Sequence, residues 1–210
     1  GLNDHDIFYS NCYVAPIASA GYLYEINTLP NVNLSNPWWV TAALKGLSVD
    51  NRVYLVTGDI SPTSLLTSSC LVFNKVLFAN NDMEAPYQLV RDGKWTIDKL
   101  AEMTKGLSYD RNGDGKMNMG DDLYSFSSWM CDSPYSLFYG SGGTLSVKDA
   151  NDIPSVSFDY DKISSIYEKI YEIIIDNDSY FVTDANQYPT TYQNFANGDA
   201  YFCEITLQKI

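Results

Sequence analysis

Residues 161–175 read DKISSIYEKIYEIII, and this stretch is the clearest helical signal in the chain. Its isoleucines recur at spacings of three and four residues, so they share one face of an α-helix. The members of this face are Ile163, Ile166, Ile170, Ile173 and Ile174. An apolar face of this kind is normally buried. The stretch therefore predicts a helix that packs against a core.

Short apolar runs of strand length lie on both sides of this helix, at residues 6–9, 52–57, 69–73 and 200–206. Further helices are predicted from caps and from glycines that end helices. They run over residues 15–24, from Asn36-Pro37 onward, over 96–107 and over 192–196. Because helices alternate with strands along the chain, the sequence predicts an α/β fold.

The composition limits the classes of function. The 210 residues suffice for one domain or two small lobes, and 45% of them are hydrophobic. The formal net charge of −13 argues against nucleic acid as a partner and favours cations or neutral ligands. The chain carries 17 tyrosines, 9 phenylalanines and 4 tryptophans, whose flat faces suit stacking on sugars as well as protein contacts.

The cysteines and the single histidine exclude several kinds of site. None of the four cysteines belongs to a CxxC pair, and His5 is the only histidine. A zinc site and a nucleophile activated by histidine are therefore not expected. Cys70 and Cys203 lie in apolar runs, where a buried free thiol is the usual state. The chain has no apolar run long enough for a membrane span.

Residues 110–121, DRNGDGKMNMGD, follow the spacing of an EF-hand calcium loop. Gly115 stands where the loop backbone must turn sharply. The predicted oxygen ligands of Ca²⁺ are Asp110, Asn112, Asp114, the carbonyl of Lys116, Asn118 and Asp121. We expect the ion to be structural. The alternative is a plain turn, because Asp, Asn and Gly also dominate turns.

Several passages, taken in order, resemble extracellular solute-binding proteins of carbohydrate ABC importers, the family 1 type that includes maltodextrin-binding proteins. These passages are DHDIFY (4–9), AGYLYEI (20–26), DNRVYLV (50–56), LVFNK (71–75), Pro86 with GKWTID (93–98), and YQNFANGDA (192–200). Each passage is short, and the likeness rests on their order. The resemblance covers nearly the whole chain.

The resemblance implies the type II periplasmic-binding-protein architecture, with two lobes that close around a ligand by hinge motion. It assigns residues 1–57 to the C-terminal part of lobe one, 58–62 to the hinge and 63–210 to lobe two, which contains the loop 110–121. The chain then corresponds to an internal fragment of such a protein. It implies binding without catalysis.

The resemblance also implies positions for carbohydrate contacts. Ser10, Asn11 and Tyr13 follow the first predicted strand, and Asp59 lies in the predicted hinge. The remaining candidates are Trp129, Asp132 and Tyr135 in an aromatic segment, and the pair Trp38 and Trp39. Each also has a structural alternative: the aromatic side chains can be core residues, and Asp132 can be a helix cap.

The implied partners are a small carbohydrate and the membrane subunits of an ABC permease. The resemblance implies an extracellular, monomeric protein of Gram-positive type, anchored by a lipid on a cysteine upstream of Gly1. Three alternatives stay open. They are an extracellular glycan-active enzyme using two carboxylates, a calcium-stabilised module resembling dockerins or adhesins, and a structural surface protein. The sequence does not select a particular sugar.

Overall fold

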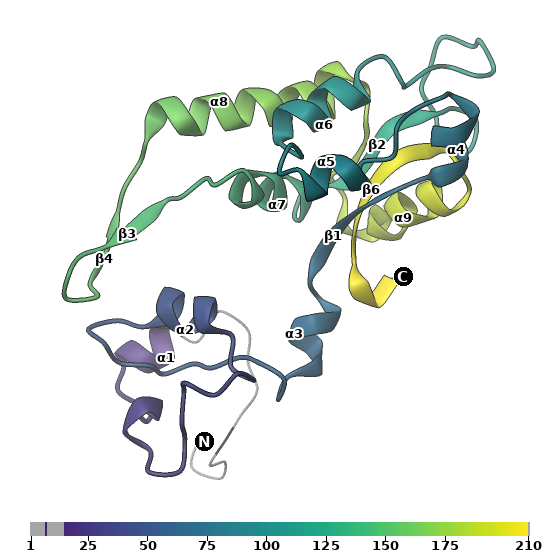
Figure 1. The fold of residues 1–210 in the computed structure, drawn as a ribbon. Coiled ribbons are helices and arrows are strands. Elements are labelled where there is room, and N and C mark those ends of the chain that lie inside the picture. Colours follow the sequence, from purple (N-terminus) through teal and green to yellow (C-terminus); the bar gives the residue numbers. More distant parts are fainter. Residues whose placement is uncertain (1–6, 8–14, 210) are drawn as a thin grey trace. The chain divides into compact units, whose positions relative to one another are not determined.

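A computed structural model describes Ile7 and residues 15–209. The strand predicted at 6–9 and the candidates Ser10, Asn11 and Tyr13 therefore lie outside the described residues. The chain divides into two compact units (Figure 1). The first combines the described residues up to Leu65 with Ser146–Val156, and the second combines Leu66–Leu145 with the residues from Ser157 onward. Each unit is described by itself.

The second unit is built on a four-stranded mixed sheet with the order β1-β6-β2-β5. Its strands are β1 (Ser69–Phe73), β2 (Tyr124–Trp129), β5 (Tyr180–Val182) and β6 (Ala200–Thr206). β2 runs parallel to both β5 and β6, whereas β1 runs antiparallel to β6. The strands predicted at 69–73 and 200–206 are confirmed, and so is a mixed α/β domain.

Helices flank this sheet. They are α4 (Lys75–Asn80), α5 (Tyr87–Arg91), α6 (Ile97–Thr104), α7 (Ser133–Gly140), α8 (Tyr160–Tyr171) and α9 (Tyr188–Ala196). Short turns of helix occupy Glu172–Asp176, Ala185–Gln187 and Leu207–Lys209. α9 packs on β6, β2 and β5, while α6 and α7 pack on α8. Successive side chains of β6 point to opposite faces of the sheet. Phe202 packs in the hydrophobic core on one face. On the other face, the Cys203 Sγ lies 3.8 Å from the Thr191 carbonyl oxygen of α9.

The predicted isoleucine face of α8 is confirmed as the centre of this core. Ile166, Ile170, Ile173 and Ile174 are buried there, and Ile163 packs partly buried against them. Asp159 caps the helix by accepting the Lys162 N–H at 3.1 Å. The last turn, Glu172–Asp176, continues as a π-helix. α6 starts after its predicted cap, Thr96, and ends at Thr104 rather than near Leu107.

The first unit contains α1 (Ala15–Ser19), a 3-10 turn (Ile26–Thr28), α2 (Thr41–Leu47) and the hairpin of β3 (Ser146–Lys148) with β4 (Pro154–Val156). α3 (Pro62–Leu66) lies at the boundary between the units. The Lys148 Nζ attaches the hairpin to the end of α2. It donates to the carbonyl oxygens of Lys45 and Ser48, each at 2.5 Å, and pairs with Asp152 at 2.9 Å.

Two sequence predictions in the first unit are wrong. No helix begins at Asn36-Pro37, because Trp39 forms a β-bridge with Gly58 and the Val40 N–H donates to the Thr57 carbonyl oxygen at 2.9 Å. These contacts hold the segment extended, so α2 begins only at Thr41. Residues 52–57 do not form a strand, because their described backbone pairings are single, isolated contacts.

Gly58→Ala is expected to destabilise the first unit. A Cβ at this position would lie 1.9 Å from the Trp38 carbonyl oxygen, a backbone atom that can yield only if the loop moves. Overpacking of this kind costs about 1–3 kcal/mol. Urea unfolding would measure the loss. Gly46→Ala in α2 is the matched control, because the added Cβ meets nothing within 4 Å and alanine favours a helix interior. Equal stability of the wild type and Gly58→Ala would contradict the prediction.

Candidate ligand-binding site

The carboxyl ends of β2, β5 and β6 lie at one edge of the sheet, because these strands are parallel. The antiparallel strand β1 brings Ser69 to the same edge, opposite Thr206. After β2 the chain passes to β5 on one side and then to β6 on the other. Ligands of open α/β sheets bind outside the carboxyl ends of strands at such a change of direction.

An aromatic pair stands at this edge. Trp129 is the last residue of β2 and Tyr188 is the first of α9. Their ring centroids are 4.5 Å apart, and their planes are inclined by 44°. Tyr192 extends the group, with its ring 5.9 Å from that of Tyr188. Aromatic faces of this kind suit the apolar side of a sugar ring.

A carboxylate lies beside the aromatic pair. Asp132 occupies the N-cap position of α7, but its side chain makes no capping hydrogen bond. Burial raises the pKa of the Asp132 carboxyl group. Burial likewise raises the pKa of Tyr188, and the nearby charge of Asp132 adds to that rise. The fold thus leaves the Asp132 carboxyl group free to accept hydrogen bonds at this edge.

Buried polar atoms without partners collect at the same edge. Among the described residues, eight buried side-chain atoms lack a hydrogen-bond partner, and six of them lie here. The six are Ser128 Oγ, Trp129 Nε1, Ser133 Oγ, Glu204 Oε1, Glu204 Oε2 and Thr206 Oγ1. An unpaired buried polar group costs about 1–3 kcal/mol. Because side chains alternate along a strand, Trp129 lies on the face of the sheet that α9 covers, whereas Ser128, Glu204 and Thr206 lie on the opposite face. The unpaired atoms therefore belong to two groups, one on each face.

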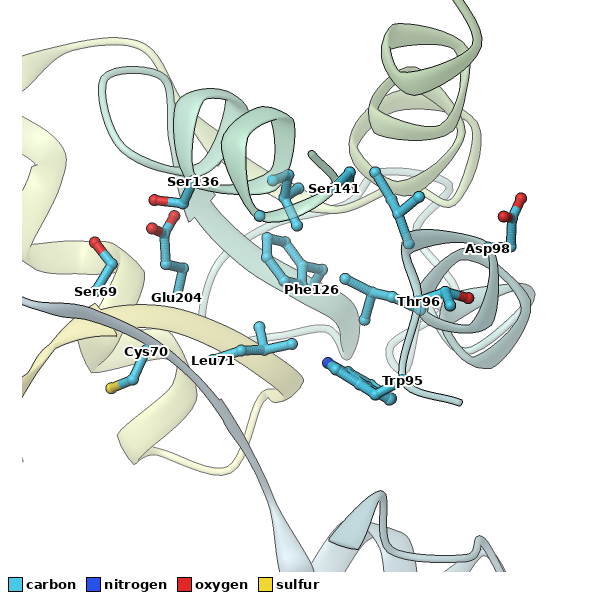
Figure 2. Close-up of a pocket in the computed structure, with 14 residues that line it drawn as sticks. Ser69, Cys70, Leu71, Trp95, Thr96, Asp98, Phe126, Ser136, Ser141 and Glu204 are labelled. Carbon is cyan, nitrogen blue, oxygen red and sulfur yellow. The ribbon is translucent and has the colours of Figure 1, made fainter. Parts of the chain in front are cut away.

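A cavity of about 610 Å³ adjoins this edge, lined by parts of β1, β2, β6, α6 and α7. Figure 2 shows Glu204, Ser69 and Ser136 gathered toward one end of the cavity and Trp95 toward the other. Burial raises the pKa of Glu204, against the opposing effect of the neighbouring hydroxyl groups of Ser133 and Ser136. Asp132 adds to the rise.

Glu204→Gln is expected to stabilise the protein at neutral pH. Burial raises the pKa of Glu204 in the folded state, so ionising this carboxyl group destabilises the fold. The protonated carboxyl group carries no such penalty at low pH, and the penalty appears as the pH rises through the folded-state pKa. The variant should therefore be more stable than the wild type at pH 7. The gain should shrink as the pH falls toward the ordinary glutamate pKa of 4.5. Thermal unfolding across this range measures it, and a gain that does not depend on pH would contradict the assignment.

The structure brings some predicted site residues together. Trp129 and Asp132 meet at the sheet edge, while Tyr135 lies on α7 and is 59% exposed. In the first unit, the Asp59 N–H donates to the Trp38 carbonyl oxygen at 2.9 Å, and Trp39 pairs with Gly58. The backbones of Trp38, Trp39 and Asp59 thus lie together in the first unit. The Trp39 indole N–H donates to the Asn33 carbonyl oxygen at 3.0 Å, which gives this ring a structural contact.

The residues of the edge that were not predicted include Ser133, Tyr188 and Glu204. Glu204 had a usable signal, because a carboxylate interrupts the apolar run AYFC-E-I of a strand. Inward-facing charges in strands are uncommon and call for a reason. Tyr188 had none, since only the packing of α9 brings it to the end of β2. Ser133 directly follows the predicted Asp132 in the sequence.

In the predicted calcium loop, backbone N–H groups donate hydrogen bonds to side-chain oxygens of the same loop. The two carboxylate oxygens of Asp110 accept the Gly113 and Gly115 N–H groups at 2.6 and 2.7 Å. The bond from Gly115 is the main cause of the lowered pKa of Asp110. The Asn112 Oδ1 accepts the Asp114 N–H at 2.9 Å. Gly115 has a φ of 79°, which glycine adopts without strain.

The ends of this loop are fixed by Asp122, which is buried and accepts the Arg111 and Asn118 N–H groups at 2.9 and 2.6 Å. Asp121, the last predicted ligand, is exposed. In the part of the chain that the structure describes, no three Asp, Glu, His or Cys side chains are grouped as a metal site. The oxygen donors still suit Ca²⁺ chemically, because an oxygen that accepts one hydrogen bond keeps a second lone pair.

Neither the comparison with protein-family models nor the comparison with curated proteins gives a match. Among the described residues, no helix is both long and apolar enough to cross a membrane.

Proposed function

We propose that this chain is part of an extracellular solute-binding protein that holds a carbohydrate and delivers it to an ABC permease. The observation that carries the proposal is the sheet edge. There, the rings of Trp129 and Tyr188 stand beside the Asp132 carboxyl group, and the buried Trp129 indole N–H lacks a partner among the described residues. Sugar rings offer apolar faces to aromatic side chains and hydroxyl groups to polar atoms. No bond is made or broken in this function.

The proposal includes the two-lobe, type II architecture. The division of the chain into two compact units supports it, and the boundary at Leu65 and Leu66 lies close to the predicted hinge at 58–62. Trp38, Trp39 and Asp59 give the first unit aromatic and carboxyl groups of its own. A ligand that binds both lobes favours their closed state, because it contacts more protein there.

The proposal also includes a structural calcium ion at residues 110–121. A ligand that binds only the folded state at 100 times its Kd adds about 2.7 kcal/mol of stability. We therefore expect the Tm to rise by about 5–10 °C in calcium relative to chelator. The variant Asp110→Asn, Asp114→Asn should lose this rise, and Asp161→Asn outside the loop should keep it. Coincident melting curves in calcium and chelator would exclude the ion.

A second candidate function is glycoside hydrolysis, which one observation favours. Asp132 and Glu204 interact electrostatically at the same edge, and burial raises the pKa of both. Two carboxyl groups with raised pKa beside aromatic rings are the elements that a glycosidase uses. Release of the chromophore from aryl glycosides, lost in Asp132→Asn, would favour this candidate over transport.

Calorimetric titration of neutral mono- and oligosaccharides in calcium tests the proposed function. We expect saturable binding of one saccharide class without turnover. Folding is checked by circular dichroism on the same sample. A folded protein that binds no saccharide of the panel would overturn the carbohydrate assignment.

A further inference from the structure

The cavity beside the sheet has apolar walls and one acidic end. Its volume of about 610 Å³ falls in the range of small-molecule sites. The walls are formed by Leu71, Trp95, Phe126 and Leu137. Its rim reaches solvent, since Ser69, Thr96 and Asp98 are exposed. The volume, the apolar walls and the open rim together suit a small organic molecule.

The acidic end is Glu204, whose two carboxylate oxygens are both buried. In the described part of the chain, neither oxygen makes a hydrogen bond of good geometry, although the hydroxyl groups of Ser133, Ser136 and Ser69 lie near enough to lower the Glu204 pKa. Ser69 and Ser136 line the same end (Figure 2). Asp98 is the other acid on the lining, and its carboxylate lies 3.7 Å from the Lys169 Nζ. The described lining residues include no lysine, arginine or histidine, so Glu204 has no counter-ion among them.

A buried carboxylate without a counter-ion must either bind a proton or acquire a cation. A ligand ammonium group supplies the missing positive charge and three N–H donors. The carboxylate can accept some of these hydrogen bonds, and serine hydroxyl oxygens can accept the others. An anionic ligand would meet two carboxyl groups on the lining and a chain with a net charge of −13. A neutral alcohol supplies one donor without the charge.

We propose that this cavity binds a primary ammonium group carried on a small apolar body, with Glu204 as its counter-ion. The apolar body lies against Trp95, Leu71 and Phe126. This ammonium site differs from the saccharide site in its aromatic residues, because Trp129 and Tyr188 are not among the described residues that line the cavity.

Titration with 2-phenylethylammonium and with its neutral isostere, 2-phenylethanol, tests this inference. The indole N–H signal of Trp95 in a ¹⁵N spectrum reports binding, and Trp95→Phe assigns that signal. At pH 7 and low salt we expect the ammonium compound to bind about tenfold more tightly than the alcohol or better. Glu204→Gln should remove this preference. Asp98→Asn is the matched control and should keep it, because Asp98 is exposed and paired with Lys169.

Equal affinity for the two compounds in the wild type would overturn the proposal, and so would a preference that survives in Glu204→Gln. The comparison of the two compounds in the wild type needs no variant, so it decides the proposal by itself. Loss of saccharide binding in the calorimetric panel leaves this result unaffected, so the two proposals fail separately.

Discussion

Trp129→Ala is expected to weaken saccharide binding about 100-fold, which corresponds to about 3 kcal/mol. The substitution removes the ring that packs on Tyr188 at 4.5 Å and the buried indole N–H that lacks a partner in the described structure. A saccharide would lose both a stacking face and a hydrogen-bond donor. The loss should appear in calorimetry as a rise in Kd.

Two further variants separate these contributions. Trp129→Phe keeps an aromatic face but lacks the N–H, so its loss should be about tenfold. Tyr160→Ala is the control, since this tyrosine is 73% exposed at the start of α8, and it should bind as the wild type does. Undiminished binding by a folded Trp129→Ala protein would place the saccharide elsewhere.

Phe202→Ala is expected to lower the free energy of unfolding of the second unit by about 3–5 kcal/mol. Phe202 is fully buried on β6, at the centre of the sheet. Its ring lies 5.3 Å from that of Phe78 and 6.2 Å from that of Trp95. The alanine variant would leave a cavity that these rings and the strands around them cannot fill.

Urea unfolding, followed by tryptophan fluorescence, measures this loss. Val76→Ala on α4 is the matched control, because Val76 is 67% exposed. Surface changes of this kind usually alter stability by less than about 0.5 kcal/mol. A loss near that of Val76→Ala would show that Phe202 does not hold the core together.

The sequence predicted the second unit better than the first, because the hydrophobic periodicity of its helices and strands is stronger. The isoleucine face of 161–175 and the apolar run 200–206 form the elements expected of them, because periodicity and burial agree there. In the first unit the long-range pairing of Trp39 with Gly58 overrides the helix signal at Pro37. The hairpin 146–156 joins the first unit through Lys148, a contact about 100 residues apart in sequence that no local pattern announces.

For the candidate site, Trp129 and Asp132 were predicted from their place in an aromatic segment. Tyr188 and Glu204 were not predicted, because the parallel pairing of β2 with β5 and β6 is what carries them to the same edge. The polar atoms without partners are visible only when burial is known. Residue type therefore indicated the chemistry, and the sheet topology determined which residues share the site.

The most direct measurement of the central claim follows the indole N–H signal of Trp129 in a ¹⁵N spectrum during titration with the saccharide found by calorimetry. A saccharide at the sheet edge should shift this signal saturably, with the calorimetric Kd, because the unpaired N–H gains an acceptor. The Trp95 signal, in the separate cavity, should stay in place. Saturable binding by calorimetry with an unmoved Trp129 signal would contradict the account.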